Sequence, residues 1–224
     1  MLRKILLFLF LLASLSGYAS HLRSGEISYQ AVPGMPNTFL ITFTIYTNVA
    51  SSTADVNTLP VSLGDGSNPT LTRINGSAGF VNGKACTHIG ELITPLIRKN
   101  IFTVQHTFPA NRSFTISTSP TARNAGIVNM SGSLTANMYI DAMLTTSLTP
   151  MNSPELTFPP IDDGCLNYIY KINPGAIDPD GDVLSFQLVR CKTAGGADIP
   201  SFKYPDELDP STTFKMDSKT GIIT

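Results

Sequence analysis

The sequence has 224 residues with a formal net charge of −1, and only 14% of its residues are charged. A near-neutral chain without a basic stripe offers no electrostatic basis for binding nucleic acid or an anionic lipid surface. Its many Ser, Thr and Asn residues, with 16 Pro and 17 Gly, favour short strands joined by turns.

The first 19 residues are predicted to be a secretory signal peptide. A positive pair, Arg3 and Lys4, precedes the apolar run 5–15, and small residues then mark a cleavage site after Ala19. An uncleaved membrane anchor is the alternative, but the apolar run is shorter than the ~18 residues that a spanning helix needs. No later segment approaches that length, so we expect an exported mature chain, extracellular or at the cell surface, without a membrane span.

Residues 20–148 are predicted to form one antiparallel β-sandwich domain. The strongest strand pattern is NTFLITFTIYTN, in which Phe39, Ile41, Phe43 and Ile45 share one face. Shorter alternating runs follow at IFTVQHTF, SFTIST and NMYIDAML, each bounded by turn-forming residues. No segment shows a convincing helical period, since the nearest, GELITPLIRKN, has a proline in its middle.

Two stretches of this domain resemble Ig-like domains of the PKD type. VSLGDGS (61–67) is a strand that runs into a Gly-Asp-Gly turn, and VQHTFPANRSFTIS (104–117) is a strand ending in His-Thr-Phe before a second strand. The resemblance implies that Asp65 accepts hydrogen bonds from backbone amides across its turn and that His106 packs nearby. The chain departs from the family before the turn, where Ser-Leu replaces an acidic and an aromatic residue.

The stretch 149–160 is predicted to be a stiff, proline-rich linker, because proline lacks a backbone donor and favours extended chain. Residues 161–224 would form a second β-sandwich, with strand-like runs at LNYIYKI, VLSFQLV and TFKMD. A sandwich of this type needs about 80 to 100 residues to close both sheets. We therefore expect the second sandwich to be incomplete and the chain to be the N-terminal part of a longer protein, with a naturally small end domain as the alternative.

The stretch AIDPDGDVLSFQL carries three closely spaced carboxylates, Asp178, Asp180 and Asp182. Three acids in one polar turn lack the contrasting environments that general acid–base catalysis requires. Two alternatives stay open, a solvated structural turn and a calcium site, since calcium takes about six to eight oxygens from clustered carboxylates and turn carbonyls. The D-x-D-G-D-x-L-x-F segment, with TTFKMDSKTGIIT downstream, resembles cadherin-like modules. That resemblance implies calcium as the cofactor, completed by acidic residues near the module junction. Asp162 and Asp163 lie just after the linker, and Asp163 is taken as the candidate ligand.

Three cysteines follow the signal peptide, and export permits disulfides. Cys165 and Cys191 flank two consecutive strand-like runs, so a bond between them is a candidate that would leave Cys86 as a buried thiol. Cys86 also lies two residues from His88, but neither a nucleophile pair nor a zinc site has its further partner there. The sequence therefore predicts no catalytic residue.

Seven features, in order along the mature chain, resemble the N-terminal region of large gliding-motility-associated surface proteins that Bacteroidetes-type bacteria export by type IX secretion. They are SHLRSGEISYQ, FLITFTIYTN, the Gly-Asp-Gly turn, QHTF, ARNAGIVNMSGS, NSPELTFPPIDDGC and NPGAIDPDGDVLSFQLV. The resemblance implies a non-enzymatic, multi-module protein whose partner is a surface polysaccharide or another protein.

Three kinds of function are open on this basis. The first is an adhesion, interaction or spacer protein whose modules are stiffened by calcium. The second is an accessory N-terminal region of a larger secreted hydrolase, because PKD-like modules commonly flank such enzymes. The third, a carbohydrate-binding sandwich, is disfavoured because the chain has no Trp and its aromatic residues fall mostly at core-facing positions.

Overall fold

Strands paired in antiparallel sheets dominate the computed structural model, so the predicted all-β class is confirmed. The structure describes residues 22–49, 57–81, 83–121, 123–124, 126–147, 149, 151–161, 164–165, 168–211 and 214–224. Among these residues, the helical segments are a 3-10 turn, η2 (Ala194–Gly196), and one turn of α-helix, α2 (Pro205–Leu208). None of them is long and apolar enough to cross a membrane.

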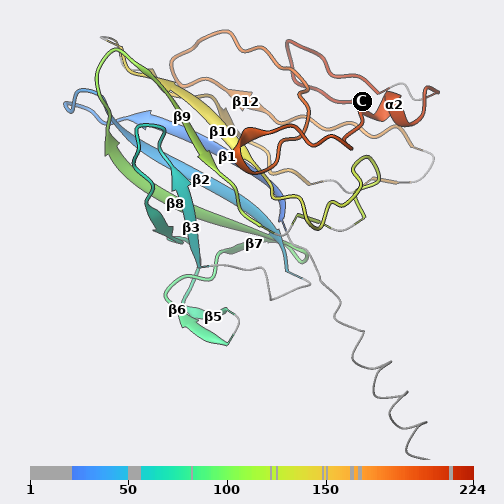
Figure 1. The fold of residues 1–224 in the computed structure, drawn as a ribbon, viewed down its shortest axis with the longest axis horizontal. Coiled ribbons are helices and arrows are strands. Elements are labelled where there is room, and N and C mark those ends of the chain that lie inside the picture. The colour runs from blue at the N-terminus through green and yellow to red at the C-terminus, as the bar shows by residue number, and fades with distance from the viewer. Residues whose placement is uncertain are drawn as a thin grey trace, which may run out of the picture.

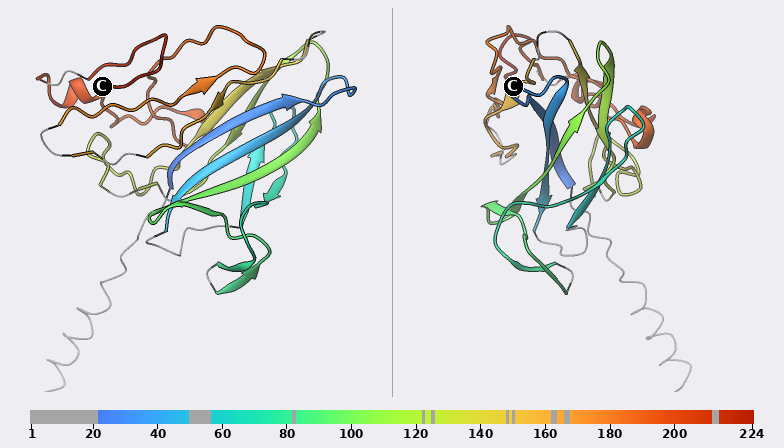
Figure 2. Two further views of the ribbon diagram at one scale, coloured as in Figure 1. Left: turned by 180° about the vertical axis from the view of Figure 1, so that it is seen from behind. Right: turned by 90° about the vertical axis from the view of Figure 1, so that its left-hand side faces the viewer.

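Two four-stranded antiparallel sheets form a sandwich (Figure 1). The first sheet has the order β1 (Leu22–Ala31), β2 (Thr38–Asn48), β8 (Ile97–Thr107) and β7 (Glu91–Thr94). The second has the order β10 (Ile140–Thr145), β9 (Ser113–Thr118), β3 (Thr58–Ser62) and β4 (Thr70–Thr72). A small separate hairpin, β5 (Gly79–Val81) and β6 (Lys84–Cys86), projects from one end (Figure 2).

The core lies between the two sheets and is built from alternate residues of the long strands. The four residues of β2 that were predicted to share a face are all buried in it: Phe39, Ile41, Phe43 and Ile45. Leu59, Ile116 and Leu144 meet them from the second sheet. Burying side chains of this size stabilises the fold by roughly 1.5–3 kcal/mol each, so this cluster is the main source of stability.

The outer face of the first sheet is covered as well. Thr44 and Tyr46 alternate with the core residues of β2, yet they are only 5% and 4% exposed. Residues 154–160, 172–174 and 216–223 pack over this face. The sheet is therefore covered on both sides around Thr44 and Tyr46, whereas Leu40 at the other end of the same face stays 40% exposed. The alternating pattern of β2 does not indicate this partial cover.

The C-terminal region, residues 168–224, contains little regular β-structure. Its β12 (Ala176–Ile177) pairs with β11 (Glu155–Leu156), and isolated bridges join Ile223 to Ile172 and Met216. The predicted strand at 183–189 is wrong, because this run finds no partner strand among the described residues. Its amide at Phe186 instead donates to the carbonyl of Ser218 at 2.8 Å.

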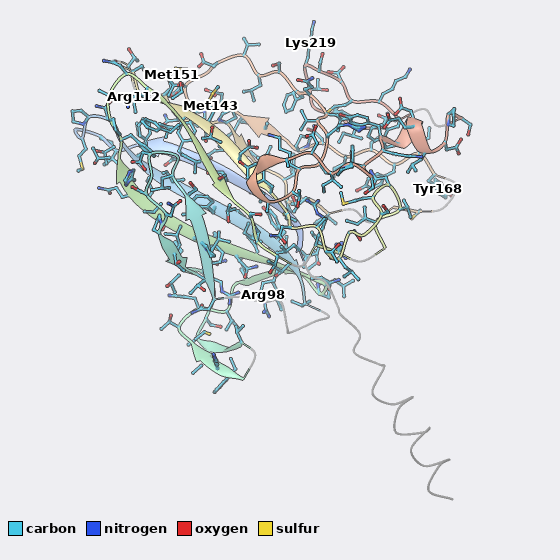
Figure 3. The ribbon with its side chains drawn as sticks, viewed as in Figure 1. Arg98, Arg112, Met143, Met151, Tyr168 and Lys219 are labelled. Atoms are coloured by element: carbon cyan, nitrogen blue, oxygen red, sulfur yellow. The ribbon has the colours of Figure 1, made fainter. Side chains whose placement is uncertain are left out.

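The C-terminal region lies along the side of the sandwich that carries β1 and β10 (Figures 1 and 2). Tyr168 and Lys219 project outward from it (Figure 3), and Tyr168 is 80% exposed. A second, smaller apolar cluster lies where the two parts meet, since Met130 packs with Ile199 and Phe202. Apolar packing therefore joins the two parts at this place.

Candidate functional site

The Gly-Asp-Gly turn after β3 is tied to β8 by the side chain of Asp65. One carboxylate oxygen, Oδ1, accepts a hydrogen bond from the amide of Ser67 at 2.9 Å, and Oδ2 lies 2.7 Å from Nε2 of His106. These contacts confirm both expectations drawn from the sequence for this turn. Burial raises the pKa of Asp65, but the hydrogen bonds from His106 and Ser67 outweigh it and lower the pKa to about 2.

The Asp65–His106 pair packs against the hydrophobic core and is mostly shielded from solvent. The His106 ring packs edge-on against Phe108, with 4.6 Å between ring centroids, and the two paired side chains are 11% exposed for Asp65 and 23% for His106. Phe108 in turn contacts Phe39. This arrangement is a structural contact between the turn after β3 and strand β8, and we assign no ligand to it.

The carboxylates of the DPDGD stretch are placed by a tight turn. The carbonyl of Asp178 accepts from the amide of Gly181 at 3.2 Å, and its Oδ1 accepts from the amides of Asp180 and Asp182 at 2.8 and 3.2 Å. Proline at the second position of the turn and Asp at the first both favour this geometry. Asp178 thus holds the turn that presents Asp180.

Asp180 reaches from this turn to the segment that was predicted to be a linker. Its Oδ2 accepts from the backbone amide of Asn152 at 2.6 Å, and its Oδ1 accepts from the side-chain amide of Asn152 at 2.8 Å. Both contacts are charge-assisted hydrogen bonds, which are stronger than neutral ones. Two residues 28 positions apart are joined in this way.

The same segment covers the edge of β1. Asn152 Oδ1 accepts from the amide of Ala31 at 2.9 Å, Ser153 Oγ accepts from the amide of Tyr29 at 2.8 Å, and the Ser153 amide donates to the carbonyl of Tyr29 at 2.9 Å. We call Asn152, Ser153 and Asp180 the edge clasp. An open strand edge exposes unpaired backbone groups, and the edge clasp satisfies two of the amides of β1.

Two further sets of contacts fix the C-terminal region farther along the sandwich. Arg123 is buried and donates from Nη2 to the carbonyl of Lys192 at 3.0 Å, while Lys192 Nζ lies 3.1 Å from Asp141 Oδ2 on β10. Asn129 and Lys203 exchange two hydrogen bonds of 2.9 Å, one of them between backbone groups. Together with the edge clasp, these contacts lie at three separate places and restrain rotation of the C-terminal region against the sandwich.

The described turn does not by itself make a calcium site. Within the described residues, no group of three or more His, Cys, Asp or Glu side chains is placed to hold a metal ion. Asp178 and Asp180 direct carboxylate oxygens to protein amides, and the candidate ligand Asp163 lies outside the described residues. Calcium takes about six to eight oxygens, and the described part of this turn falls short of that set. Calcium here stays a prediction of the sequence.

All three cysteines are free thiols in the structure, so the candidate bond between Cys165 and Cys191 is not formed in it. Cys165 is exposed, whereas Cys191 packs against the small cluster around Ile199. Near Cys86, the ring nitrogen Nδ1 of His88 lies 2.9 Å from the carbonyl oxygen of Gly76, which is a structural contact.

Sequence reasoning missed Asn152 and Ser153, because their neighbouring prolines indicate a linker. A signal for their role was present in the residue types, since Asn and Ser side chains readily bond to backbone groups. The residue types do not show that these side chains bond to β1, because that strand lies more than 120 positions away in the sequence.

No family model, curated protein or solved structure matches this chain.

Proposed function

We propose that this protein is an exported, non-enzymatic β-sandwich protein of the cell surface or medium, which serves as an adhesion or spacer unit. The observation that supports it most is the edge clasp, in which both carboxylate oxygens of Asp180 hold Asn152 against the edge of β1. A spacer has to transmit position and force, and a hinge at residues 149–160 would defeat that purpose.

The physical argument rests on attachment at several points. A flexible linker between two bodies leaves them free to rotate, whereas inter-domain contacts that are spread over a surface remove that freedom. Here the edge clasp, the Arg123–Lys192 contact and the Asn129–Lys203 pair lie at separate places. Export enters this proposal from the signal-peptide pattern of residues 1–19. The PKD-like and cadherin-like relationships and the link to gliding motility enter it from the sequence resemblance.

The test is limited proteolysis of residues 20–224 carrying Asp180→Asn, with Asp182→Asn as the matched control. The substitution would replace one carboxylate oxygen at position 180 by an NH₂ donor, which would face the donors of Asn152. We therefore expect faster cleavage within residues 149–163. Asp182 is exposed, and its amide rather than its carboxylate bonds within the turn, so its variant should be cut at the wild-type rate. Equal cleavage of all three proteins would contradict a clasped, rigid junction.

A further inference from the structure

A small cavity lies between the outer face of the first sheet and the segments that cover it. Its volume is about 180 Å³. Ser24, Glu26 and Tyr46 of β1 and β2 form its floor, and residues 156–160, 172–174 and 216–223 contribute its walls. The cavity therefore exists only because the C-terminal region folds back onto the sheet.

The walls of this cavity are mostly apolar, with Asn173 and Gln187 as their polar residues. They carry the side chains of Leu156, Phe158, Ile172, Phe186, Met216 and Ile223, with three prolines. Phe186 is held in the wall by close contact with Gly221, since a Cβ at that glycine would lie 2.6 Å from its ring. Apolar cavities of about 150 Å³ bind a benzene-sized ring, so this one has room for a single ring.

Among the described residues that line the cavity, the charged group is the carboxyl of Glu26. The hydroxyl of Tyr46 donates to Glu26 Oε1 at 3.1 Å. Burial raises the pKa of Glu26, and this effect outweighs the opposing hydrogen bond from Tyr46 and the charge of Lys99. Burial also raises the pKa of Tyr46. The nearby charge of Glu155 raises the pKa of Glu26 further, and a cation in the cavity would stabilise the ionised carboxylate.

Glu26 is accessible from a second, more polar cavity as well. That cavity is about 390 Å³ and shares Glu26 and Leu156 with the first. Thr42, Thr44 and Lys99 line it from β2 and β8. A ligand held at Glu26 can therefore place an apolar body on one side of the carboxyl and a polar group on the other.

We propose that the first cavity is a binding site for a small aromatic amine, with the ring among the apolar walls and the ammonium group at the carboxylate of Glu26. The ring fills a space of matching size, and the ammonium group forms a charge-assisted hydrogen bond with the carboxylate of the lining. The site goes beyond the spacer role, because it adds a ligand to the junction between the two parts.

The probe set consists of phenethylamine, phenylacetate and ethylbenzene, which share a ring and differ in charge. Titration of residues 20–224 is followed by the methyl NMR signals of Ile172, Met216 and Ile223, with Ile116 of the central core as the distant reference. We expect phenethylamine to shift the three cavity signals, to leave Ile116 unchanged, and to bind about tenfold more tightly than ethylbenzene. Phenylacetate should bind more weakly than both, since its carboxylate repels Glu26.

Two variants test whether the carboxyl of Glu26 causes the preference for the amine. Glu26→Gln keeps the side-chain size and can still accept from Tyr46, so the fold should persist while the preference for the amine over ethylbenzene disappears. Glu91→Gln, on the exposed edge strand β7, should leave that preference intact. Thermal melts of both variants check that they are folded.

The proposal is overturned if none of the three probes shifts the cavity signals of the folded protein. It is also overturned if the acid binds as tightly as the amine, or if Glu26→Gln retains the preference. Because Asp180→Asn tests the edge clasp independently, failure of this site would leave the spacer proposal standing.

Discussion

His106 Nε2 on β8 lies 2.7 Å from Asp65 Oδ2 in the turn after β3, so this pair fastens one sheet of the sandwich to the other. β8 belongs to the first sheet, whereas β3 belongs to the second. The contact joins residues 41 positions apart and continues inward through Phe108. The pair adds a polar contact between the two sheets, while the apolar core supplies most of the stability.

Acidification should weaken the contact between Asp65 and His106. The pKa of Asp65 is about 2 in the folded chain, below its ordinary value of 3.8, so its contribution is fully present above pH ~4 and is lost as the pH falls towards 2. The lowered pKa corresponds to about 2 kcal/mol. In urea unfolding, Asp65→Asn should be less stable than wild type by up to about that amount at pH 7, and the difference should shrink near pH 2. The exposed Asp206→Asn serves as the control, and a difference that stays constant with pH would contradict the assignment.

Gly64 is required in the turn that carries Asp65. Its φ is +82°, and a Cβ there would lie 2.7 Å from the carbonyl oxygen of Thr115. Gly64→Ala should therefore cost more than the roughly 1–3 kcal/mol of a left-handed alanine alone, because β9 would also have to move. Gly34→Ala is the matched control, since Gly34 has a φ of +75° but no described atom within 4 Å of its Cβ position. Equal losses in urea unfolding would show that the close approach to β9 is unimportant.

Asn100 should be among the most sensitive polar residues of the sandwich. It is 2% exposed, and its side-chain amide donates to the carbonyl of Ile45 and the hydroxyl of Thr47, both at 3.0 Å, while its oxygen accepts from Arg73. Asn100→Ala removes these bonds within the buried interior and should cost about 3 kcal/mol or more in urea unfolding. Asn68→Ala, at an exposed turn position, should change the stability by less than about 0.5 kcal/mol. A loss at Asn100 no larger than at Asn68 would contradict the importance of this network.

Calcium dependence separates the two interpretations of the DPDGD turn. If hydrogen bonds alone hold the edge clasp, the melting temperature should be the same with calcium and with chelator, and Asp180→Asn should lower it equally in both. If calcium binds with a Kd of ~10⁻⁴ M, about 2 mM calcium should add roughly 1.8 kcal/mol that is lost in Asp180→Ala. The geometry of the described residues favours the first result. A rise in melting temperature that depends on calcium would instead show that the turn binds the metal.

Thiol labelling tests the cysteines. The native chain should react with a thiol reagent first at Cys165, which is exposed, and more slowly at Cys86 and Cys191, which are half-buried. Mass spectrometry after a short pulse identifies the labelled residue. If Cys165 and Cys191 remain unlabelled in the denatured, unreduced chain and react only after reduction, the disulfide that the sequence suggested exists.

Much of the first sandwich follows from the pattern of residues along the chain. Alternation places Phe39, Ile41, Phe43 and Ile45 on one face whatever the partner strand is, because successive side chains of a strand point to opposite sides. The packing of His106 near the turn of Asp65 is also expected, but from the resemblance of the turn and strand motifs rather than from periodicity, and the structure adds the direct contact between the two side chains. Local chemistry likewise placed Asp178 at the start of a turn.

The conformation of the C-terminal region depends instead on contacts between residues far apart in the chain. Alternation at 183–189 resembles that of β2, but a strand forms only where a neighbouring strand supplies a row of opposing donors and acceptors. Among the described residues no strand pairs with this run, and its Phe186 amide donates to the carbonyl of Ser218 outside any strand. The same reason turns residues 152–153 from a predicted linker into the cover of β1, because the edge of that strand has amides to satisfy. The cavity at Glu26 arises in turn from that folding back, since its floor and its walls lie more than a hundred positions apart.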